Sequence, residues 1–365
     1  MKSNIKDKVT AIGFTAVLAA VLILNIALPD RDVSSAERRK LDKFPKFTAE
    51  SLLEGDFFED LEDYALDQFV MRDTLRTVKS AVRLGGFMQL ESNDLFVRDG
   101  GIFKLSPEVN VTAVQTNCAK LMNTASSVWP EAKLYYTIVP EKNAFIEDGV
   151  YPAFDRELYN STVAQAMSGA QNINVDDLLG IEDYYLTDPH WRQENIVDIA
   201  DRLLVSMGSP ANEEGSLTEH TAASFFGTYQ GQLPLAPEQD VLRYLAGEKT
   251  ENSTVFNYET GRTGSVYNPD KLSAMDPYDF YLDGACALLR IDNPDGVEGK
   301  ELVIFRDSFG SSIAPLLISD YQTVTLVDLR YVSSQVLGQY VTPAENTDVL
   351  FLFSQTILNN NGVFR

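Results

Sequence analysis

The first pattern along the chain is an apolar run over residues 9–28, which contains no charged residue. A run of this length can cross a bilayer as one helix. Its basic flank holds three lysines opposed by one aspartate: Lys2, Lys6, Lys8 and Asp7. Positive charge before a span predicts a cytoplasmic N-terminus. The run exceeds a signal-peptide core and no small-residue cleavage site follows it. We predict an uncleaved signal anchor over residues 1–28, with a cleaved signal peptide as the alternative.

After this segment, the polar residues 29–46 predict a linker, and residues 47–365 are expected to form the main domain outside the cytoplasm. Between residues 48 and 84, apolar positions recur at steps of three and four, which predicts two amphipathic helices broken near Gly55. Next, two short apolar runs flank Asp99-Gly100-Gly101, a pattern typical of a β-hairpin.

The same periodicities predict the rest of the elements. Helical patterns cover residues 111–128, 155–169 and 196–204, and Gly208 ends the last of these helices. Short, nearly continuous apolar runs predict buried strands at residues 133–139, 173–179, 301–308, 323–330 and 348–354.

Buried strands that alternate with helices indicate an α/β fold, with a parallel sheet covered on both faces. Residues 209–300 differ, because they are rich in Gly, Asn, Thr and Tyr and show weak periodicity. We predict that this segment is an irregular β-rich insertion.

Composition narrows the class of protein. The chain has 365 residues, of which 44% are hydrophobic, enough for one large domain or two smaller ones. Thirty Lys and Arg against 53 Asp and Glu give a net charge of −23, which disfavours nucleic acid as a partner. The two cysteines, Cys118 and Cys286, exclude a disulfide-dense scaffold. Two free, buried thiols are favoured over one long-range disulfide.

Several catalytic signatures are absent from the sequence. It contains no phosphate-binding G-x-x-x-x-G-K-[ST], no dinucleotide-type G-x-G-x-x-G after the first strand, no H-E-x-x-H and no G-x-S-x-G. Two segments remain that bear reactive side chains, residues 186–191 (LTDPHW) and 305–311 (FRDSFGS). Both are expected at the carboxyl ends of strands, where ligands bind in open α/β sheets.

These two segments supply a nucleophile, a base and an orienting carboxylate: Ser308, His190 and Asp188. A serine becomes nucleophilic only beside a base that is itself oriented. Gly310 allows backbone N–H groups to approach a developing oxyanion near Ser308.

Each of these residues also has a structural explanation. Asp188-Pro189 is a good helix start, with Asp as N-cap and Pro at the first position. Ser308 fits a strand-end turn capped by Asp307. His220, the other histidine, lies in a polar stretch and is expected to be an exposed loop residue.

With these motifs in place, the sequence resembles the DHHW family of exported bacterial proteins, which belongs with the AlgX/AlgJ-like, SGNH-hydrolase-like proteins of alginate O-acetylation. The resemblance rests chiefly on TDPHW and RDSFG in that order. It also covers NDLFVRDGGIFKL and the helical segment near the start. Relative to ordinary SGNH esterases, whose serine block comes first, this order looks circularly permuted.

The resemblance implies a Ser-His-Asp triad of Ser308, His190 and Asp188. Pro189 replaces the first His of the name motif, which removes a second imidazole from any metal site; neither a metal nor a cofactor is implied. Weaker candidates for substrate or oxyanion contacts are Gly310, Arg306, Lys142, Trp191 and Arg330. For the two arginines, ordinary salt bridging is the favoured alternative.

The implied activity is transfer of acetyl groups to hydroxyls of an exopolysaccharide or cell-wall glycan. A carbohydrate acetylesterase would use the same triad, with water as acceptor. A multi-span membrane protein that delivers the acetyl group is implied as a partner. A non-catalytic, membrane-anchored glycan-binding or assembly protein is the alternative from another class.

Overall fold

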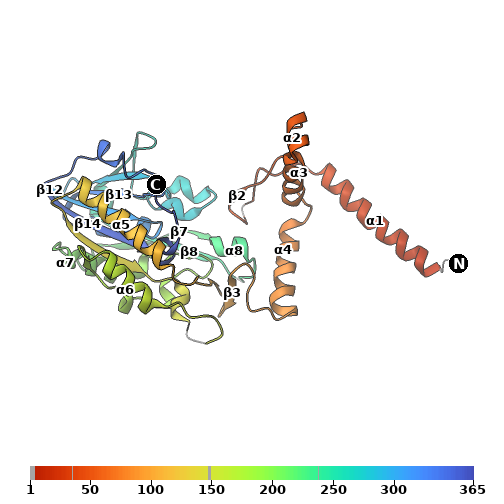
Figure 1. The fold of residues 1–365 in the computed structure, drawn as a ribbon, viewed down its shortest axis with the longest axis horizontal. Coiled ribbons are helices and arrows are strands. Elements are labelled where there is room, and N and C mark those ends of the chain that lie inside the picture. Colours follow the sequence, from red (N-terminus) through yellow and green to blue (C-terminus); the bar gives the residue numbers. More distant parts are fainter. Residues whose placement is uncertain (1–4, 35, 147–148, 237) are drawn as a thin grey trace. The chain divides into compact units, whose positions relative to one another are not determined.

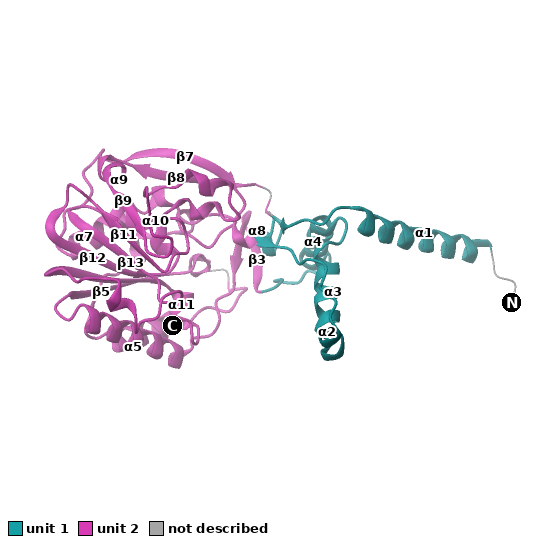
Figure 2. Cartoon of the chain, turned by 90° about the horizontal axis from the view of Figure 1, so that it is seen from above, with its two compact units in different colours: residues 1–93, 230–235 teal, residues 94–229, 236–365 magenta. Residues whose placement is uncertain are grey.

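The structure is a computed structural model that describes all residues except 1–4, 35, 147–148 and 237 (Figure 1). The chain divides into two compact units, which Figure 2 colours separately. Unit 1 contains residues 1–93 and 230–235, and unit 2 contains residues 94–229 and 236–365. The linker over 29–46 and the domain over 47–365 stay predictions.

Unit 1 begins with helix α1, Ile5–Ala27, whose side chains are almost all exposed. This helix is long and apolar enough to cross a membrane. Of its predicted basic flank, Lys2 lies outside the described residues. The short strands β1 (Val33–Ser34) and β2 (Arg39–Lys40) follow.

Three α-helices follow, α2 (Ala49–Glu54), α3 (Asp56–Asp67) and α4 (Arg72–Ala81), and a π-helix covers Val82–Gly86 directly after α4. Gly55 separates α2 from α3 with φ of 97°, a left-handed conformation that favours glycine. The predicted break at Gly55 is therefore confirmed. The interruption between α3 and α4 was not predicted.

Unit 2 is built on an eight-stranded sheet in the order β10-β9-β11-β13-β12-β14-β5-β6. The pairs from β13 to β6 are parallel, and those from β10 to β13 are antiparallel. The strands are β5 (Lys133–Val139), β6 (Gln171–Asn172), β9 (Thr254–Asn257), β10 (Arg262–Gly264), β11 (Leu288–Asp292), β12 (Val297–Arg306), β13 (Tyr321–Val327) and β14 (Asn346–Ser354). The α/β fold predicted from the apolar runs is confirmed, but the sheet is mostly parallel rather than wholly parallel, because β10, β9 and β11 join it in antiparallel pairs.

Helices cover both faces of this sheet. Alternate residues of a strand point to opposite sides, so the central strands contribute side chains to two apolar clusters. On β12, Val303 and Phe305 pack in one cluster with α5 (Val111–Val128) and α6 (Arg156–Ala166). Leu302 and Ile304 pack in the other with α7 (Val197–Ser206) and α10 (Phe309–Ile313). Cys118 and Cys286 are buried in different clusters and are free thiols.

Two hairpins stand outside the main sheet. Strands β3 (Leu95–Arg98) and β4 (Gly101–Lys104) form the predicted hairpin, with Asp99 and Gly100 at positive φ in the turn. Strands β7 (Thr218–Phe225) and β8 (Asp240–Ala246) form the second hairpin. The remaining short helices are α8 (Thr228–Gln232), α9 (Glu248–Asn252) and α11 (Gln355–Asn359).

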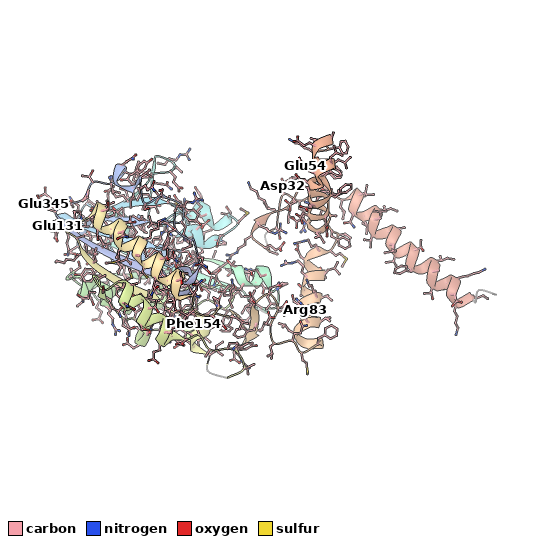
Figure 3. The ribbon with its side chains drawn as sticks, viewed as in Figure 1. Asp32, Glu54, Arg83, Glu131, Phe154 and Glu345 are labelled. Atoms are coloured by element: carbon pink, nitrogen blue, oxygen red, sulfur yellow. The ribbon has the colours of Figure 1, made fainter. Side chains whose placement is uncertain are left out.

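Two predicted elements differ from the structure. The strand predicted at residues 173–179 lies earlier, as β6, and a 3₁₀ turn occupies Asp176–Leu178. Residues 209–300 are β-rich, yet β9, β10 and β11 extend the central sheet. Figure 3 labels Glu131 and Glu345, which stand just before β5 and β14 and mark the amino end of the parallel strands.

Candidate active site

Residues 184–191, which we name the Asp-His loop, hold Asp188 and His190 at the opposite, carboxyl end of the strands. The loop closes on itself through a bridge between Tyr184 and Trp191 and a hydrogen bond from Tyr185 N to His190 O of 3.1 Å. The backbone N–H of His190 also donates to Asp188 Oδ1 at 3.2 Å. The helix-start explanation of Asp188 is wrong, because no helix begins there: a 3₁₀ turn covers Gln193–Asn195 and α7 follows.

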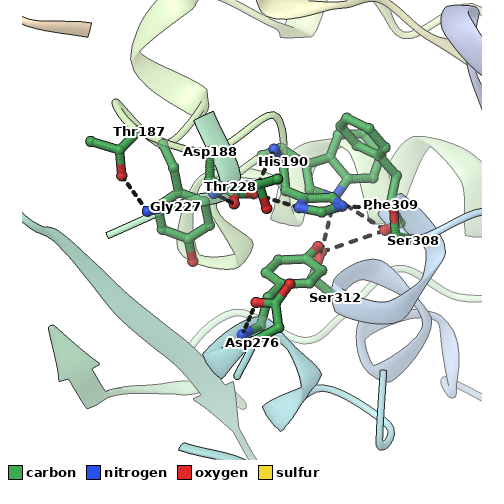
Figure 4. A network of polar contacts seen from close by, with 12 residues as sticks. Thr187, Asp188, His190, Gly227, Thr228, Asp276, Ser308, Phe309 and Ser312 are labelled. Carbon is green, nitrogen blue, oxygen red and sulfur yellow. Dashed lines mark hydrogen bonds and ion pairs between the residues drawn. The ribbon is translucent and has the colours of Figure 1, made fainter. Parts of the chain in front are cut away.

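Ser308, His190 and Asp188 form a continuous relay of hydrogen bonds (Figure 4). Ser308 Oγ lies 2.7 Å from His190 Nε2, although 118 residues separate them in sequence. His190 Nδ1 lies 2.5 Å from Asp188 Oδ1. Asp188 is fully buried and His190 is 7% exposed, whereas Ser308 is half-buried. The geometry is that of a nucleophile, a base and an orienting carboxylate.

The protonation of His190 reflects two opposing effects. Burial of the imidazole lowers its pKa, and the charge and hydrogen bond of Asp188, together with the charges of Asp276 and Asp307, raise it by more. The pKa of His190 is therefore raised above its ordinary value of 6.5. A base with a raised pKa accepts the serine proton more readily.

Asp307 fixes the turn that carries Ser308. Its Oδ1 accepts from Phe309 N at 2.9 Å, and its Oδ2 accepts from Ser354 N at 2.7 Å, at the end of the neighbouring strand β14. The turn is thus tied to two strand ends of the sheet. The cap expected of Asp307 is present, and it coexists with the contact between Ser308 and His190.

A second segment, residues 227–229, supports Asp188, and no sequence motif indicated it. Thr228 N donates to Asp188 Oδ2 at 2.8 Å, and Gly227 N donates to Thr187 Oγ1 at 2.6 Å (Figure 4). A Cβ at Gly227 would lie 2.2 Å from Thr187 O. Close backbone approach therefore requires glycine here, a signal invisible without the fold.

Tyr278 was also missed by the sequence analysis. Its ring stacks on the imidazole of His190, with centroids 4.0 Å apart and planes at 10°. Its hydroxyl donates to Ser312 Oγ at 2.8 Å. An aromatic face at this distance favours the protonated imidazole and limits its rotation.

Two of the weaker candidates, Trp191 and Arg306, lie near the relay, but their polar atoms are engaged in hydrogen bonds within the protein. Trp191 is fully buried, and its Nε1 donates to Phe309 O at 3.2 Å and to Ser312 Oγ at 2.9 Å. Arg306 is also fully buried, and burial lowers its pKa. Its guanidinium donates to Ser311 Oγ at 2.8 Å and to Gly284 O at 2.9 Å. These side chains support the turn around Ser308.

The other three candidates are likewise engaged. Arg330 forms an ion pair with Asp328 at 2.6 Å, the arrangement favoured for it from sequence. Gly310 N donates to Asp307 O at 3.1 Å, and an added Cβ would lie 2.6 Å from Arg306 Cβ. Lys142 is 2% exposed behind the Asp-His loop. His220 is exposed as predicted, but it lies in strand β7, where it stacks on Tyr244.

A cavity of about 460 Å³ lies beside the Asp-His loop, lined by Tyr185, Leu186, Lys142 and Asp240 among others. Ser308 and His190 do not line it. Among the residues that the structure describes, no group of three or more His, Cys, Asp and Glu side chains could hold a metal ion.

A comparison with protein-family models identifies part of the chain. Residues 179–327 match the model described as DHHW protein. The chain carries a DHHW-family domain. This DHHW-family domain includes Asp188, His190 and Ser308. A search of the curated proteins finds no match.

Solved structures share the fold at low sequence identity. A DHHW family protein from Eubacterium siraeum is 18% identical, with a TM-score of 0.62 over 75% of this chain and 94% of that one. Bacillus cereus PatB1 is 16% identical, with a TM-score of 0.61 over 74% of this chain and 99% of that one. PatB1 with a sulfonyl adduct is 15% identical, with a TM-score of 0.59 over 74% and 98%.

Proposed function

We propose that the chain is a membrane-anchored, extracytoplasmic serine acyltransferase that moves acetyl groups onto hydroxyls of an exopolysaccharide or cell-wall glycan. The observation that carries this proposal is the relay from Ser308 through His190 to Asp188. Two segments remote in sequence meet in it at hydrogen-bond distance. The apolar helix α1 supports the anchor.

In this mechanism, His190 Nε2 takes the proton of Ser308 as Oγ attacks the carbonyl carbon of an acetyl ester. The leaving alcohol departs with the proton from His190, and acetyl-Ser308 remains. A glycan hydroxyl then gives its proton to His190 and attacks the acetyl carbon. The new ester is released and Ser308 regains its proton.

The oxyanion formed in both steps needs hydrogen-bond donors. Phe309 N and Gly310 N already donate to Asp307. We therefore assign the backbone N–H of Ser308 as a donor to the oxyanion, in place of the role predicted for Gly310.

Water is the alternative acceptor, which would make the protein a carbohydrate acetylesterase. Ser308 is half-buried, so solvent reaches the reacting side of the relay, and this favours hydrolysis when no glycan is bound. Polysaccharide is proposed as acceptor on the resemblance to the alginate O-acetylation proteins.

The test uses the full chain in detergent micelles with a chromogenic acetyl ester, with and without glycan oligosaccharides. Wild type should release the chromophore, and Ser308→Ala and His190→Ala should each lose at least about 10³-fold of the rate. Acetylated oligosaccharide, detected by mass spectrometry, would identify the transferase. Acetate alone would identify the esterase.

A sulfonyl fluoride serves as a second probe, a choice supported by the sulfonyl adduct solved for PatB1. Mass spectrometry should find the adduct on Ser308 in wild type and none in His190→Ala. Equal ester turnover in wild type, Ser308→Ala and His190→Ala would contradict the catalytic proposal. So would a folded wild type that reacts with neither probe. Either result would favour the alternative, a non-catalytic glycan-binding protein.

A further inference from the structure

We propose that Lys142 and Asp240 are a pair of positioning residues that clamp the Asp-His loop from its carbonyl and amide sides and so hold His190 on Ser308. Neither residue touches the nucleophile. The inference rests on the proposed function of the relay. It states that two buried charged side chains hold the loop in the position that brings His190 to Ser308.

Lys142 holds the carbonyl side of the loop. Its Nζ donates to Tyr185 O at 2.9 Å, to Leu186 O at 3.0 Å and to Asp188 O at 3.0 Å. Three acceptors match the three N–H groups of an ammonium, whereas a neutral amine has only two. The side chain comes from the carboxyl end of β5 and is only 2% exposed.

Two aromatic rings complete the surroundings of this ammonium. Nζ lies 4.9 Å from the centre of the Phe103 ring and 5.1 Å from that of Tyr229. Aromatic faces at such distances attract a cation. The charge is therefore accommodated by loop carbonyls and rings rather than by water.

Asp240 holds the amide side of the same loop. Its Oδ1 accepts from Leu186 N at 2.7 Å, and its Oδ2 accepts from Thr187 N at 2.7 Å and from the Thr187 hydroxyl at 2.5 Å. Asp240 is the first residue of β8 and is 7% exposed. Leu186 is bound on both sides, by its carbonyl to Lys142 and by its N–H to Asp240.

The loop needs such support because regular secondary structure pairs little of its backbone: Ile102 N of β4 donates to Leu186 O at 2.8 Å, and the bridge between Tyr184 and Trp191 joins its ends. Removing either charge takes hydrogen bonds away from backbone carbonyl or amide groups of the loop, and this loss drives the loop to rearrange. A shift of about 1 Å at His190 would cost on the order of 100-fold in rate, since proton transfer requires hydrogen-bond distance.

The clamp also has a pH signature. Burial lowers the pKa of Lys142 to about 7, against the charges of Asp188, Asp240 and Glu141, which raise it. Above this pH the amine loses a proton and, with it, one of its three hydrogen bonds. The reactivity of Ser308 should therefore fall on the alkaline side, and this fall should depend on Lys142.

The experiment compares Lys142→Met and Asp240→Asn with two matched controls in the full chain in micelles. Lys300 is also a buried lysine, which donates to Ser209 Oγ at 2.7 Å and to Asp320 at 2.8 Å. Asp348 is a buried aspartate that accepts from the Tyr321 hydroxyl at 2.9 Å. Lys300→Met and Asp348→Asn thus remove buried charges that do not touch the loop.

The first readout is the rate at which phenylmethylsulfonyl fluoride labels Ser308, as a function of pH and at a fixed interval below each variant's Tm. Lys142→Met and Asp240→Asn should label at least about 100-fold more slowly, with the controls within about threefold of wild type. The alkaline fall should disappear in Lys142→Met. Equal slowing in both lysine variants, or an alkaline fall that persists without Lys142, would overturn the clamp.

The second readout is independent of catalysis. The proton between His190 Nδ1 and Asp188 should give a far-downfield proton NMR signal in Ser308→Ala. That signal should be lost when Lys142→Met or Asp240→Asn is added, and kept with either control. Its retention in the clamp variants would refute the clamp. The two proposals can also fail separately. If wild type is not labelled, yet adding Lys142→Met or Asp240→Asn to Ser308→Ala abolishes the signal, only the proposed function is refuted.

Discussion

Asp188 is held through both of its carboxylate oxygens, and each oxygen has a separate task. Oδ1 faces His190 Nδ1 at 2.5 Å, and Oδ2 accepts from Thr228 N at 2.8 Å. A carboxylate fixed at both oxygens cannot rotate away from the imidazole. The orientation of His190 is therefore set by backbone groups from a different part of the chain.

Replacement of Asp188 by Asn tests this balance through pH. Because His190 acts when neutral, wild-type activity should rise with pH through a pKa above 6.5. Without the carboxylate of Asp188, only the charges of Asp276 and Asp307 oppose the effect of burial on that pKa, so the acid limb of the rate profile should move to lower pH. The maximal rate should fall on the order of 10³-fold. An acid limb that stays in place would contradict the role given to Asp188.

Gly227 offers a test of close backbone packing. In Gly227→Ala the new Cβ would lie 2.2 Å from Thr187 O and 2.4 Å from Asp188 Cβ, so the loop must shift. We expect a loss of about 1–3 kcal/mol in the free energy of unfolding, measured by denaturant titration, together with lower ester turnover.

The matched control is Gly264→Ala. No atom lies within 4 Å of a Cβ added at Gly264, and its φ is not positive, so this variant should change neither stability nor turnover. Similar effects of the two substitutions would remove the steric argument.

At the scale of elements, α10 is short and depends on its neighbours. Trp191 connects it to the Asp-His loop through hydrogen bonds from Nε1 to Phe309 O and Ser312 Oγ. Trp191→Phe keeps most of the apolar volume and removes the donor. It should cost about 1–2 kcal/mol of stability and lower ester turnover.

Trp129→Phe is the corresponding control for this substitution. Trp129 is also buried, but it packs edge-on against Phe305 in the cluster on the other face of the sheet. Loss of stability without loss of turnover is expected from it. Equal loss of turnover in both tryptophan variants would show that α10 does not depend on Trp191.

Much of the element plan was predictable from apolar periodicity. Except for β6, the strands of the parallel core, helix α5 and the β3–β4 hairpin coincide closely with their patterns. Strands β9 and β10 escaped prediction because they are only four and three residues long, and because every residue of β10 is exposed. Their membership of the sheet follows from pairing with β11, which is a tertiary contact.

The same distinction applies to the site. Asp188, His190 and Ser308 were predictable because their chemistry is rare in this chain, which has only two histidines. Gly227, Thr228 and Asp240 were not predictable, because they act through backbone hydrogen bonds that only the folded loop defines. Lys142 was proposed from sequence as a substrate contact, and the structure buries it behind the loop.

At the scale of the whole molecule, α1 predicts membrane attachment. The full chain should remain in the membrane pellet after alkaline carbonate extraction, because a bilayer-spanning helix resists this treatment. A variant without residues 1–28 should appear in the supernatant. Release of the full chain by carbonate would contradict the anchor.

The order of the strands has a consequence for how the molecule matures. Strand β14, Asn346–Ser354, follows both β5 and β12 in the chain, yet it lies between them in the parallel sheet. Ser354 also supplies the amide that holds Asp307 beside Ser308. A nascent chain that stops short of residue 346 has its serine and histidine but lacks the strand that joins the two halves of the sheet. A chain without β14 should therefore fail to assemble the relay, although Asp188, His190 and Ser308 all precede this strand.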